Sequence, residues 1–324
     1  MQRQMSLFEM GERDMDVTEL NNFVYDPSNK TAYFTEKPDT ERFIFICTAD
    51  SIKMWLSKNS EDFTWNPKVS KKICSFPLIK SHLQKAIRRR QCKAAIEGLL
   101  VMLTLDPYQT LQRLGIITIE DVCLTEGFSV LTWLMMAHKH HALTSQDVKY
   151  LCNYVESLVC QESFYESRRD IQNVTREDIT NMKESVRDEI LALYHRARYG
   201  GMKDDKIILR EATNFYAHNP YSIKRMEIGL VSKIPIDKVN QRITVLAEAI
   251  DYHPFPQMIP KIVKDTGVTA QKVKRLIWDI DSGVNLRKHH TIIKQSVALQ
   301  DYNWKRVELS LASCRIAIAE VWLV

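Results

Sequence analysis

The sequence predicts a mainly α-helical protein that begins with a small β-containing unit. Three observations predict this fold class. Only 9 Gly and 10 Pro occur in 324 residues, so few residues interrupt helices. Beyond about residue 77, apolar side chains recur at helical spacing, as at Val148, Leu151, Cys152 and Val155. Short segments rich in aromatic and β-branched residues, which favour strands, occur near the start of the chain.

Residues 1–75 are assigned to the β-containing unit. The pattern of residues 22–35 is typical of a β-hairpin, because apolar and aromatic residues flank an Asp-Pro-Ser-Asn turn at 26–29. Residues 42–47 are a third strand candidate. Residues 1–20 are polar and are expected to be loosely ordered. We therefore expect one small sheet at this end of the chain.

Residues 76–200 are assigned to a central helical bundle. The segment 78–105 is consistent with one long helix or two short ones. Asp106 is a helix-capping residue, and Pro107 follows it at the first helical position, where its missing N–H costs nothing. Ser129 is a candidate cap for a helix over the next eleven residues. The bundle is thus predicted to contain several helices of ordinary length.

Two capping boxes and a glycine pair define the end of the bundle. Thr144 and Thr175 each precede an Asp at the third helical position and then an apolar helical stripe. Gly200 and Gly201 stop the second of these helices and mark the expected domain boundary. Further helices are then expected at 207–216, 224–230, 237–250, 259–264 and 270–280, and residues 303–324 form a helix or a strand.

The third predicted unit, 201–324, contains a weak internal similarity. Residues 234–243 and 267–276 both place a Val early in a helix, followed by a cation and another apolar residue. Tandem helical modules would explain this, but chance similarity between amphipathic helices is the favoured explanation.

Composition restricts the cellular setting more than the function. The net charge of +5 permits an acidic partner without requiring one. Seven Cys form no CxxC pair, which indicates reduced thiols in an intracellular protein of the cytoplasm or nucleus. No signal peptide or membrane-spanning segment is expected, so a soluble protein without a membrane partner is predicted.

Residues 258–280 contain the most informative pattern. They predict a short helix, a turn at Gly267 and a second helix that Thr269 caps. Val273 and Leu276 would lie on the apolar side of that second helix. The opposite side would then carry polar and cationic side chains, which are the types that reach phosphates and base edges: Gln271, Lys272, Lys274 and Arg275.

This segment resembles the helix-turn-helix of bacterial repressor-type DNA-binding domains. The resemblance implies that the second helix docks in a DNA groove. Two positions depart from the pattern: Pro260 falls in the first turn of the leading helix, and the bulky Val263 stands where a small residue usually lets the helices approach. An ordinary helical hairpin with a solvated basic side is the alternative.

A dense group of cations near the start of the bundle is a second candidate contact for nucleic acid. Few acids lie nearby in sequence, which favours phosphate contact over a merely solvated helix side. The group comprises Lys85, Arg88, Arg89, Arg90 and Lys93, with Lys68, Lys71, Lys72 and Lys80 upstream. A similar extension of the basic surface is expected at Arg287, Lys288, His289 and His290.

A longer stretch resembles the helical region that follows the ATPase module in clamp-loader-related AAA+ proteins of the RarA and Werner-interacting type. The resemblance is carried by residues 83–89 (LQKAIRR), 94–96 (AAI), 101–103 (VML), 106–107 (DP) and 113–122 (RLGIITIEDV). It implies helices that assemble subunits at replication forks. No GxxxxGK[ST] motif occurs, so P-loop ATP hydrolysis is not expected.

The candidates for chemistry are weaker. His138 and His141 share a helix side together with His140 nearby, but no Cys or carboxylate lies at ligand spacing, so no metal is predicted. Asp251 and His253 lie in a proline-flanked connector without a nucleophile. Arg113 and Glu120, seven residues apart, are expected to form a structural ion pair. No catalytic residue and no cofactor are predicted.

The sequence therefore favours a non-catalytic protein that binds DNA, preferably duplex, during replication or a related process. The central bundle would self-associate or dock on replication proteins. The alternative is a helical protein–protein adaptor without nucleic-acid contact. An enzyme that uses the histidines or the connector is the least favoured reading.

Overall fold

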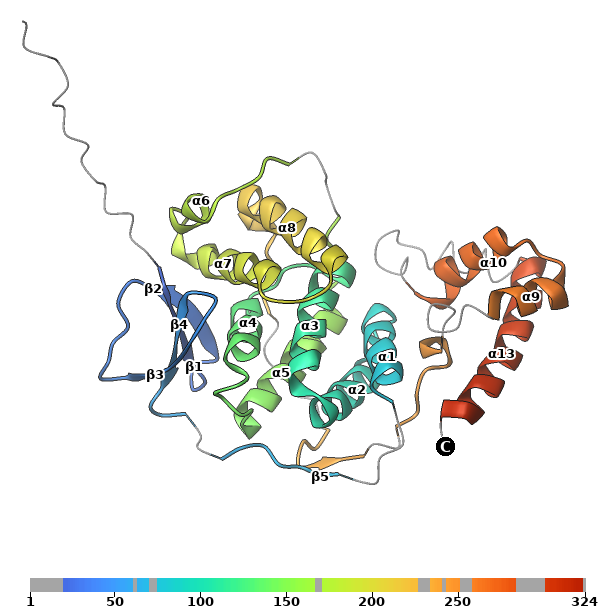
Figure 1. Ribbon diagram of the computed structural model, residues 1–324, viewed down its shortest axis with the longest axis horizontal. Coiled ribbons are helices and arrows are strands. Elements are labelled where there is room, and N and C mark those ends of the chain that lie inside the picture. The colour runs from blue at the N-terminus through green and yellow to red at the C-terminus, as the bar shows by residue number, and fades with distance from the viewer. Residues whose placement is uncertain are drawn as a thin grey trace, which may run out of the picture.

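The computed structural model of the chain describes residues 20–60, 63–69, 75–166, 171–226, 234–240, 243–250, 258–283 and 301–322 (Figure 1). Its strands are β1 Asn22–Asp26, β2 Thr31–Thr35, β3 Phe43–Ala49, β4 Ile52–Ser57, β5 Lys68–Val69 and β6 Lys238–Val239. Its α-helices are α1 Phe76–Arg88, α2 Cys92–Leu105, α3 Pro107–Asp121, α4 Phe128–Ala137, α5 Ser145–Cys160, α6 Arg176–Thr180, α7 Glu184–Arg198, α8 Lys203–His218, α9 Met258–Thr266, α10 Ala270–Leu276 and α13 Tyr302–Trp322. The predicted class, mainly α with a small β unit, is confirmed.

The N-terminal sheet has the strand order β2-β1-β4-β3. Two antiparallel hairpins, β1–β2 and β3–β4, lie side by side and are joined by parallel pairing of β1 with β4. The hairpin over 22–35 and the strand at 42–47 are as predicted. The sequence pattern missed β4, which follows β3 after a tight turn at Asp50 and Ser51, both with positive φ.

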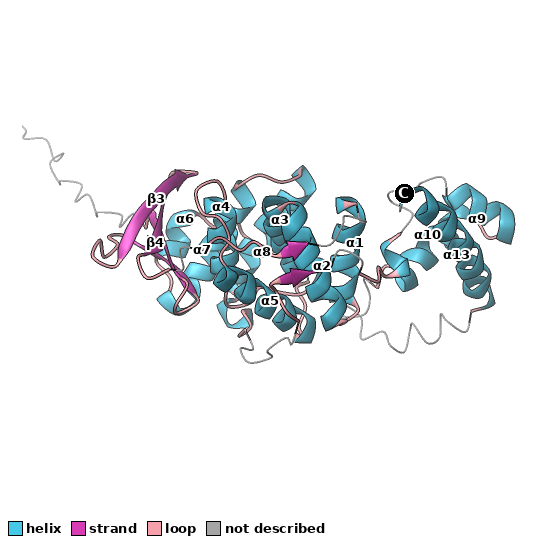
Figure 2. Cartoon of the chain, turned by 90° about the horizontal axis from the view of Figure 1, so that it is seen from below, coloured by secondary structure: helices cyan, strands magenta, loops and turns pink. Residues whose placement is uncertain are grey.

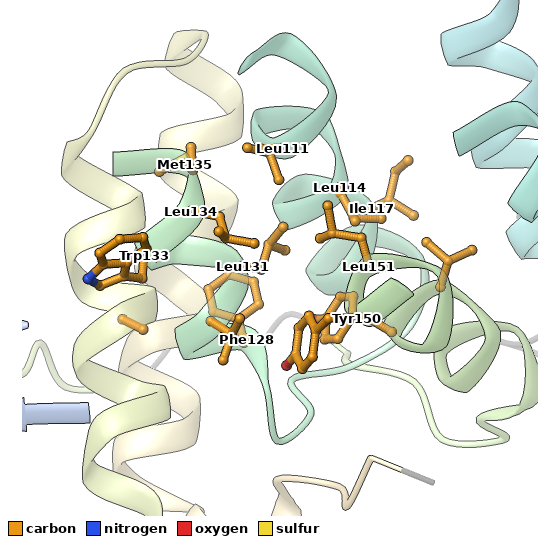
Figure 3. Close-up of a cluster of buried hydrophobic side chains, with 14 of the residues drawn as sticks. Leu111, Leu114, Ile117, Phe128, Leu131, Trp133, Leu134, Met135, Tyr150 and Leu151 are labelled. Carbon is orange, nitrogen blue, oxygen red and sulfur yellow. The ribbon is translucent and has the colours of Figure 1, made fainter. Parts of the chain in front are cut away.

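One side of this sheet packs on the helices and forms a continuous core with them. Phe23 and Phe34 stack with ring centroids 4.0 Å apart, and the Trp133 indole donates to the Phe23 carbonyl at 3.0 Å. Behind them, Leu114 of α3, Leu131 of α4 and further side chains of α5 interdigitate (Figure 3). The sheet and α1–α8 therefore share one apolar interior rather than forming separate units.

The helix starts follow their capping residues closely. Asp106 accepts the Gln109 N–H at 2.9 Å, and Thr144 and Thr175 form complete capping boxes. The box at Thr175 opens a helix of only five residues, and α7 begins separately at Glu184. Ser129, by contrast, is not the cap of α4. That helix begins two residues earlier than predicted, after Gly127, and a carboxylate from α7 accepts the N–H groups of Gly127 and Ser129.

The change from one core to the next lies later than the sequence suggested. Gly200 and Gly201 have positive φ and end α7 as predicted. However, α8 packs back on α7, and the first apolar cluster continues to Val239. A second cluster starts at Met258 and contains α9, α10 and α13. The boundary placed after residue 200 therefore separates two helices of one core.

The α-helix expected over 237–250 does not form in the described residues, where Lys238–Val239 is a strand and Ala247–Ala249 is a single 3-10 turn. The Trp65 indole donates to the Ile236 carbonyl at 2.9 Å, and Lys68 donates its N–H to the Asp237 carbonyl at 2.9 Å. These bonds hold the start of the segment extended, and β6 pairs with β5 in parallel. The second copy of a tandem helical module is thus not present. Of the helix expected at 224–230, residues 227–230 lie outside the described parts.

The two cores lie one after the other along the molecule. The sheet occupies one end and the helices α9, α10 and α13 occupy the other in both views (Figures 1 and 2). Arg89, the C-cap residue of α1, donates to the carbonyls of Ile280 and Asp281 at 3.0 and 2.8 Å, and Arg315 of α13 pairs with Asp281. In the described parts of the chain, none of the helices has the length and apolar character needed to cross a membrane.

Candidate nucleic-acid interface

A tight turn of three residues, 267–269, joins α9 to α10. Gly267 lies at φ +69°, the left-handed region, and its N–H donates to the Val263 carbonyl at 2.8 Å. Val268 then turns into the core, and Thr269 caps α10 by accepting the Lys272 N–H at 3.4 Å. Three residues thus separate α9 from α10, and the two helices pack directly on one another.

A small apolar core fixes the orientation of α10. Val273, Leu276 and Ile280 follow the spacing i, i+3 and i+7, and all three are buried. They meet Ile262 of α9 and a row of side chains on α13 that begins at Trp304. Because a third helix covers this side, only the opposite side of α10 faces solvent.

That solvent-facing side carries the four residues predicted to contact DNA. All are exposed: Gln271, Lys272, Lys274 and Arg275. Lys272 lies 3.8 Å from Asp301, and Arg275 lies 3.1 Å from Asp279 one turn further on. Exposed ion pairs of this kind contribute less than about 1 kcal/mol, so a phosphate can replace either carboxylate. Lys274 forms no ion pair with any residue that the structure describes.

Trp278 extends the same side and was missed at the sequence level. Its side chain is 40% exposed, and it follows Gln271 by seven residues and Lys274 by four. These spacings place the three side chains on one stripe of a helix, which the π-helical turn Ile277–Asp281 continues. The sequence could have predicted this position, because Gln271, Lys274 and Trp278 follow the same i, i+3, i+7 spacing that identifies the buried side.

The two departures from the helix-turn-helix pattern are accommodated. Pro260 is the third residue of α9, where a backbone N–H has no acceptor within the helix, so no hydrogen bond is lost. Val263 is half-buried and packs against the second core at its margin. Its bulk therefore does not prevent the contact between α9 and α10.

Two cations of the basic group predicted at residues 85–93 are buried inside the protein. Lys85 and Arg88 have exposed fractions of only 2% and 7%. The Lys85 ammonium donates to the Glu248 carbonyl, and the Arg88 Nε lies 2.6 Å from Asp121. The prediction that these two side chains contact phosphates is corrected, because both are engaged inside the protein.

Arg88 belongs to a polar network that joins α1 to α3. The Asp121 carboxylate also accepts the Gln84 amide at 2.8 Å, and Glu120 lies 3.5 Å from Arg88. Arg113 lies 3.8 Å from Glu120 and donates to Gln84, so the structural ion pair expected between Arg113 and Glu120 is present. The network balances charges that are distant in sequence.

The remaining cations of this group differ in exposure. Arg89 donates to the carbonyls of Ile280 and Asp281, in the π-helical turn after α10, and lies 3.4 Å from Glu248. Arg90 and Lys93 are exposed and lie near Glu162 and Glu97, respectively. Of the upstream cations, Lys68 is exposed and Lys80 is half-buried, whereas Lys71 and Lys72 lie outside the described residues. Burial lowers the pKa of Lys80.

The histidines are structural in their contacts. His141 Nε2 lies 2.8 Å from Asp147, whose other oxygen accepts the Tyr25 hydroxyl at 2.7 Å. Burial opposes the charge on Asp147, but these hydrogen bonds outweigh it and lower the pKa of the carboxyl. His138 stacks on Tyr108 at 3.8 Å. Within the described ranges, no three His, Cys, Asp or Glu side chains come together as metal ligands.

Several predicted elements fall outside the described residues. These are Asp251 and His253 of the connector, and the basic positions Arg287, Lys288, His289 and His290.

No protein-family model, curated protein or solved structure shows significant similarity to this chain. The resemblances to repressor-type helix-turn-helix domains and to the clamp-loader-related helical region therefore rest on the residues quoted above.

Proposed function

We propose that this protein binds duplex DNA through the exposed side of α10. The observation that supports this most is the separation of two sides on one short helix. Val273 and Leu276 anchor it to α9 and α13, while Gln271, Lys274 and Arg275 are exposed on the opposite side. An α-helix fits the major groove, where amide and guanidinium groups read base edges and ammonium groups meet phosphates.

The rigidity of the unit favours a duplex over a flexible partner. A third helix, α13, buttresses α9 and α10 and buries Trp304 between them. Arg89, which follows α1, donates hydrogen bonds to the carbonyls of Ile280 and Asp281 in the π-helical turn that continues α10. A helix that is fixed at both its side and its end loses little conformational entropy on docking.

The first core would then serve as the part that contacts proteins. Its helices α1–α3 contain the stretch that resembles clamp-loader-related proteins, and that resemblance is the basis for proposing a role in replication. Docking on replication proteins or self-association through this bundle is the corresponding hypothesis. No ATPase step is proposed, because the sequence has no P-loop motif.

The test is a fluorescence-anisotropy titration of labelled duplex DNA with the wild type and with Lys274→Glu/Arg275→Glu, at two salt concentrations. Removing two phosphate contacts should flatten the dependence of log affinity on log salt by about two, and the reversed charges should weaken binding further. Lys139→Glu/Lys149→Glu is the matched control. It reverses the same number of charges, and both residues are exposed and lie outside α9, α10 and α13.

The control should bind as the wild type does. Equal binding by the α10 variant, with its helical circular dichroism unchanged, would contradict the proposal that this helix carries the contact.

A helical adaptor is the second candidate, and one feature of α13 favours it. Tyr302, Leu309 and Ile316 are exposed apolar side chains spaced seven residues apart, so they form one stripe along the outside of the helix. Such a stripe is typical of a helix that packs against a partner helix. Leu309→Glu should abolish any oligomer of the protein seen by sedimentation if this stripe joins two copies, and should leave DNA binding unchanged.

A further inference from the structure

The outer side of the N-terminal sheet carries a row of three aromatic side chains and one valine. Side chains of directly paired residues lie on the same side of a sheet. Val24 pairs with Tyr33 on one side and with Trp55 on the other, and Trp55 pairs with Phe45. The four residues therefore cross all four strands in one line, over about 14 Å at the usual strand spacing.

This row does not belong to the apolar core. Val24 is buried, as is Phe43, whose ring lies 6.4 Å from that of Tyr33, yet neither joins the cluster that the sheet forms with α4 and α7. Phe45 is 51% exposed, and Trp55 and Tyr33 are half-buried. Aromatic rings thus reach solvent on the side of the sheet that faces away from the helices.

The rings are held in place by polar and edge contacts. The Trp55 indole N–H donates to the Asn22 side chain on the adjacent strand at 3.0 Å, which satisfies its only polar group. The rings of Phe45 and Trp55 meet edge to face, with centroids 5.6 Å apart and planes at 69°.

Cations border the row. Lys53 pairs with Asn22 and with Thr48, so it lies on the same side as Trp55, and it is exposed. The Arg42 guanidinium lies 5.4 Å from the centre of the Phe43 ring and 3.5 Å from Asp26, with its side chain 62% exposed. The side thus combines stacking surfaces with positive charge at its margins.

We propose that this side of the sheet binds an unpaired strand of nucleic acid. Bases would stack on the rings of Phe45 and Trp55, and phosphates would meet Lys53 and Arg42. Exposed aromatic rings on a sheet, flanked by Lys and Arg, suit this ligand because every base has a π-face and every linkage carries a negative charge. A purely apolar protein partner would gain nothing from Lys53. The site is separate from α10 and does not depend on duplex binding there.

The test is an anisotropy titration of labelled oligothymidine at low salt with the wild type, Phe45→Ala and Phe63→Ala. Phe63 is 85% exposed and lies outside the row, so it controls for loss of an exposed ring. Loss of one stacking ring should weaken binding by about 5- to 150-fold in Phe45→Ala and leave Phe63→Ala unchanged. Lys53→Glu should weaken the same binding in a salt-dependent manner. Duplex binding should be the same in all these variants.

Three outcomes would overturn the proposal. The first is a wild type that does not bind oligothymidine at low salt. The second is oligothymidine binding that survives Phe45→Ala but is lost in Lys274→Glu/Arg275→Glu, which would place unpaired strands on α10. The third is a wild-type dimer that Phe45→Ala dissociates in sedimentation, without any change in oligothymidine binding. That result would assign the row to a contact between copies of the chain.

Discussion

Replacing Glu189 by Gln is expected to remove a pH dependence from the stability of the protein. Glu189 is on α7, and its carboxylate accepts the N–H groups of Gly127 and Ser129 at 2.8 and 2.7 Å. It also accepts the Ser129 hydroxyl at 3.1 Å. It thereby caps α4, whose own N-cap residue, Gly127, has no side chain. Burial nevertheless raises the pKa of this carboxyl from its ordinary 4.5 to about 7.

The sign and size follow from proton linkage. Between about pH 4.5 and 7 the folded protein retains a proton on Glu189 that the unfolded chain has released, so stability falls as the pH rises through this range and is constant above it. At about 1.4 kcal/mol for each pH unit, the loss amounts to at most about 3 kcal/mol. Glutamine does not titrate, so this loss should be absent in Glu189→Gln.

The assay is urea unfolding of both proteins at pH 5 and pH 8. Gln is expected to lower stability at both pH values, because its single carbonyl oxygen cannot serve all three donors. The informative quantity is the difference between the two pH values, since other titrating groups contribute equally to both proteins. Glu184→Gln, on the same helix but 85% exposed, is the control and should retain the wild-type pH dependence. An equal pH dependence in Glu189→Gln and the wild type would refute the reasoning.

Three further predictions concern stability. Asp121→Ala should lower the free energy of unfolding by about 3 kcal/mol in urea titration, because it removes the 2.6 Å partner of the buried Arg88; a loss below 1 kcal/mol would contradict this. Gly267→Ala should speed amide hydrogen exchange in α10, since a Cβ at φ +69° costs about 1 kcal/mol; unchanged exchange would contradict it. Burial lowers the pKa of His195 to about 3, so stability should fall as the pH drops below the unfolded value of 6.5. His195→Phe, which can still stack on Phe34, should reduce that fall by at most about 2 kcal/mol between pH 7 and 5; an unchanged acid dependence would contradict it.

Local signals in the sequence gave correct local structure. The capping boxes at Thr144 and Thr175, the Asp106 cap and the turn at Gly267 are all in place. Each depends on bonds that span four residues or fewer, so the sequence contains both partners side by side. The exposed side of α10 was predictable for the same reason. Once the apolar residues of a helix are assigned to its buried side, the remaining residues must lie on its exposed side.

Partners that are distant in the chain account for the errors. Few acids surround Arg88 in sequence, yet Asp121 neutralises it from 33 positions away. The cap of α4 comes from Glu189, 62 residues after Gly127. The segment 237–250 has a helical apolar pattern, but the hydrogen bond from Trp65 to Ile236 holds its start extended. Periodicity cannot show which distant side chain or strand will compete with a local preference.

The pairing of β5 with β6 has a consequence for how the chain matures on the ribosome. Trp65 and its acceptor carbonyl at Ile236 are 171 residues apart. At typical translation speeds of about 5 to 20 residues per second, Trp65 is synthesised about 10 to 30 s before its partner. During that interval the Trp65 indole lacks its acceptor. The nascent chain therefore exposes an aromatic side chain that chaperones can bind until β6 has been synthesised.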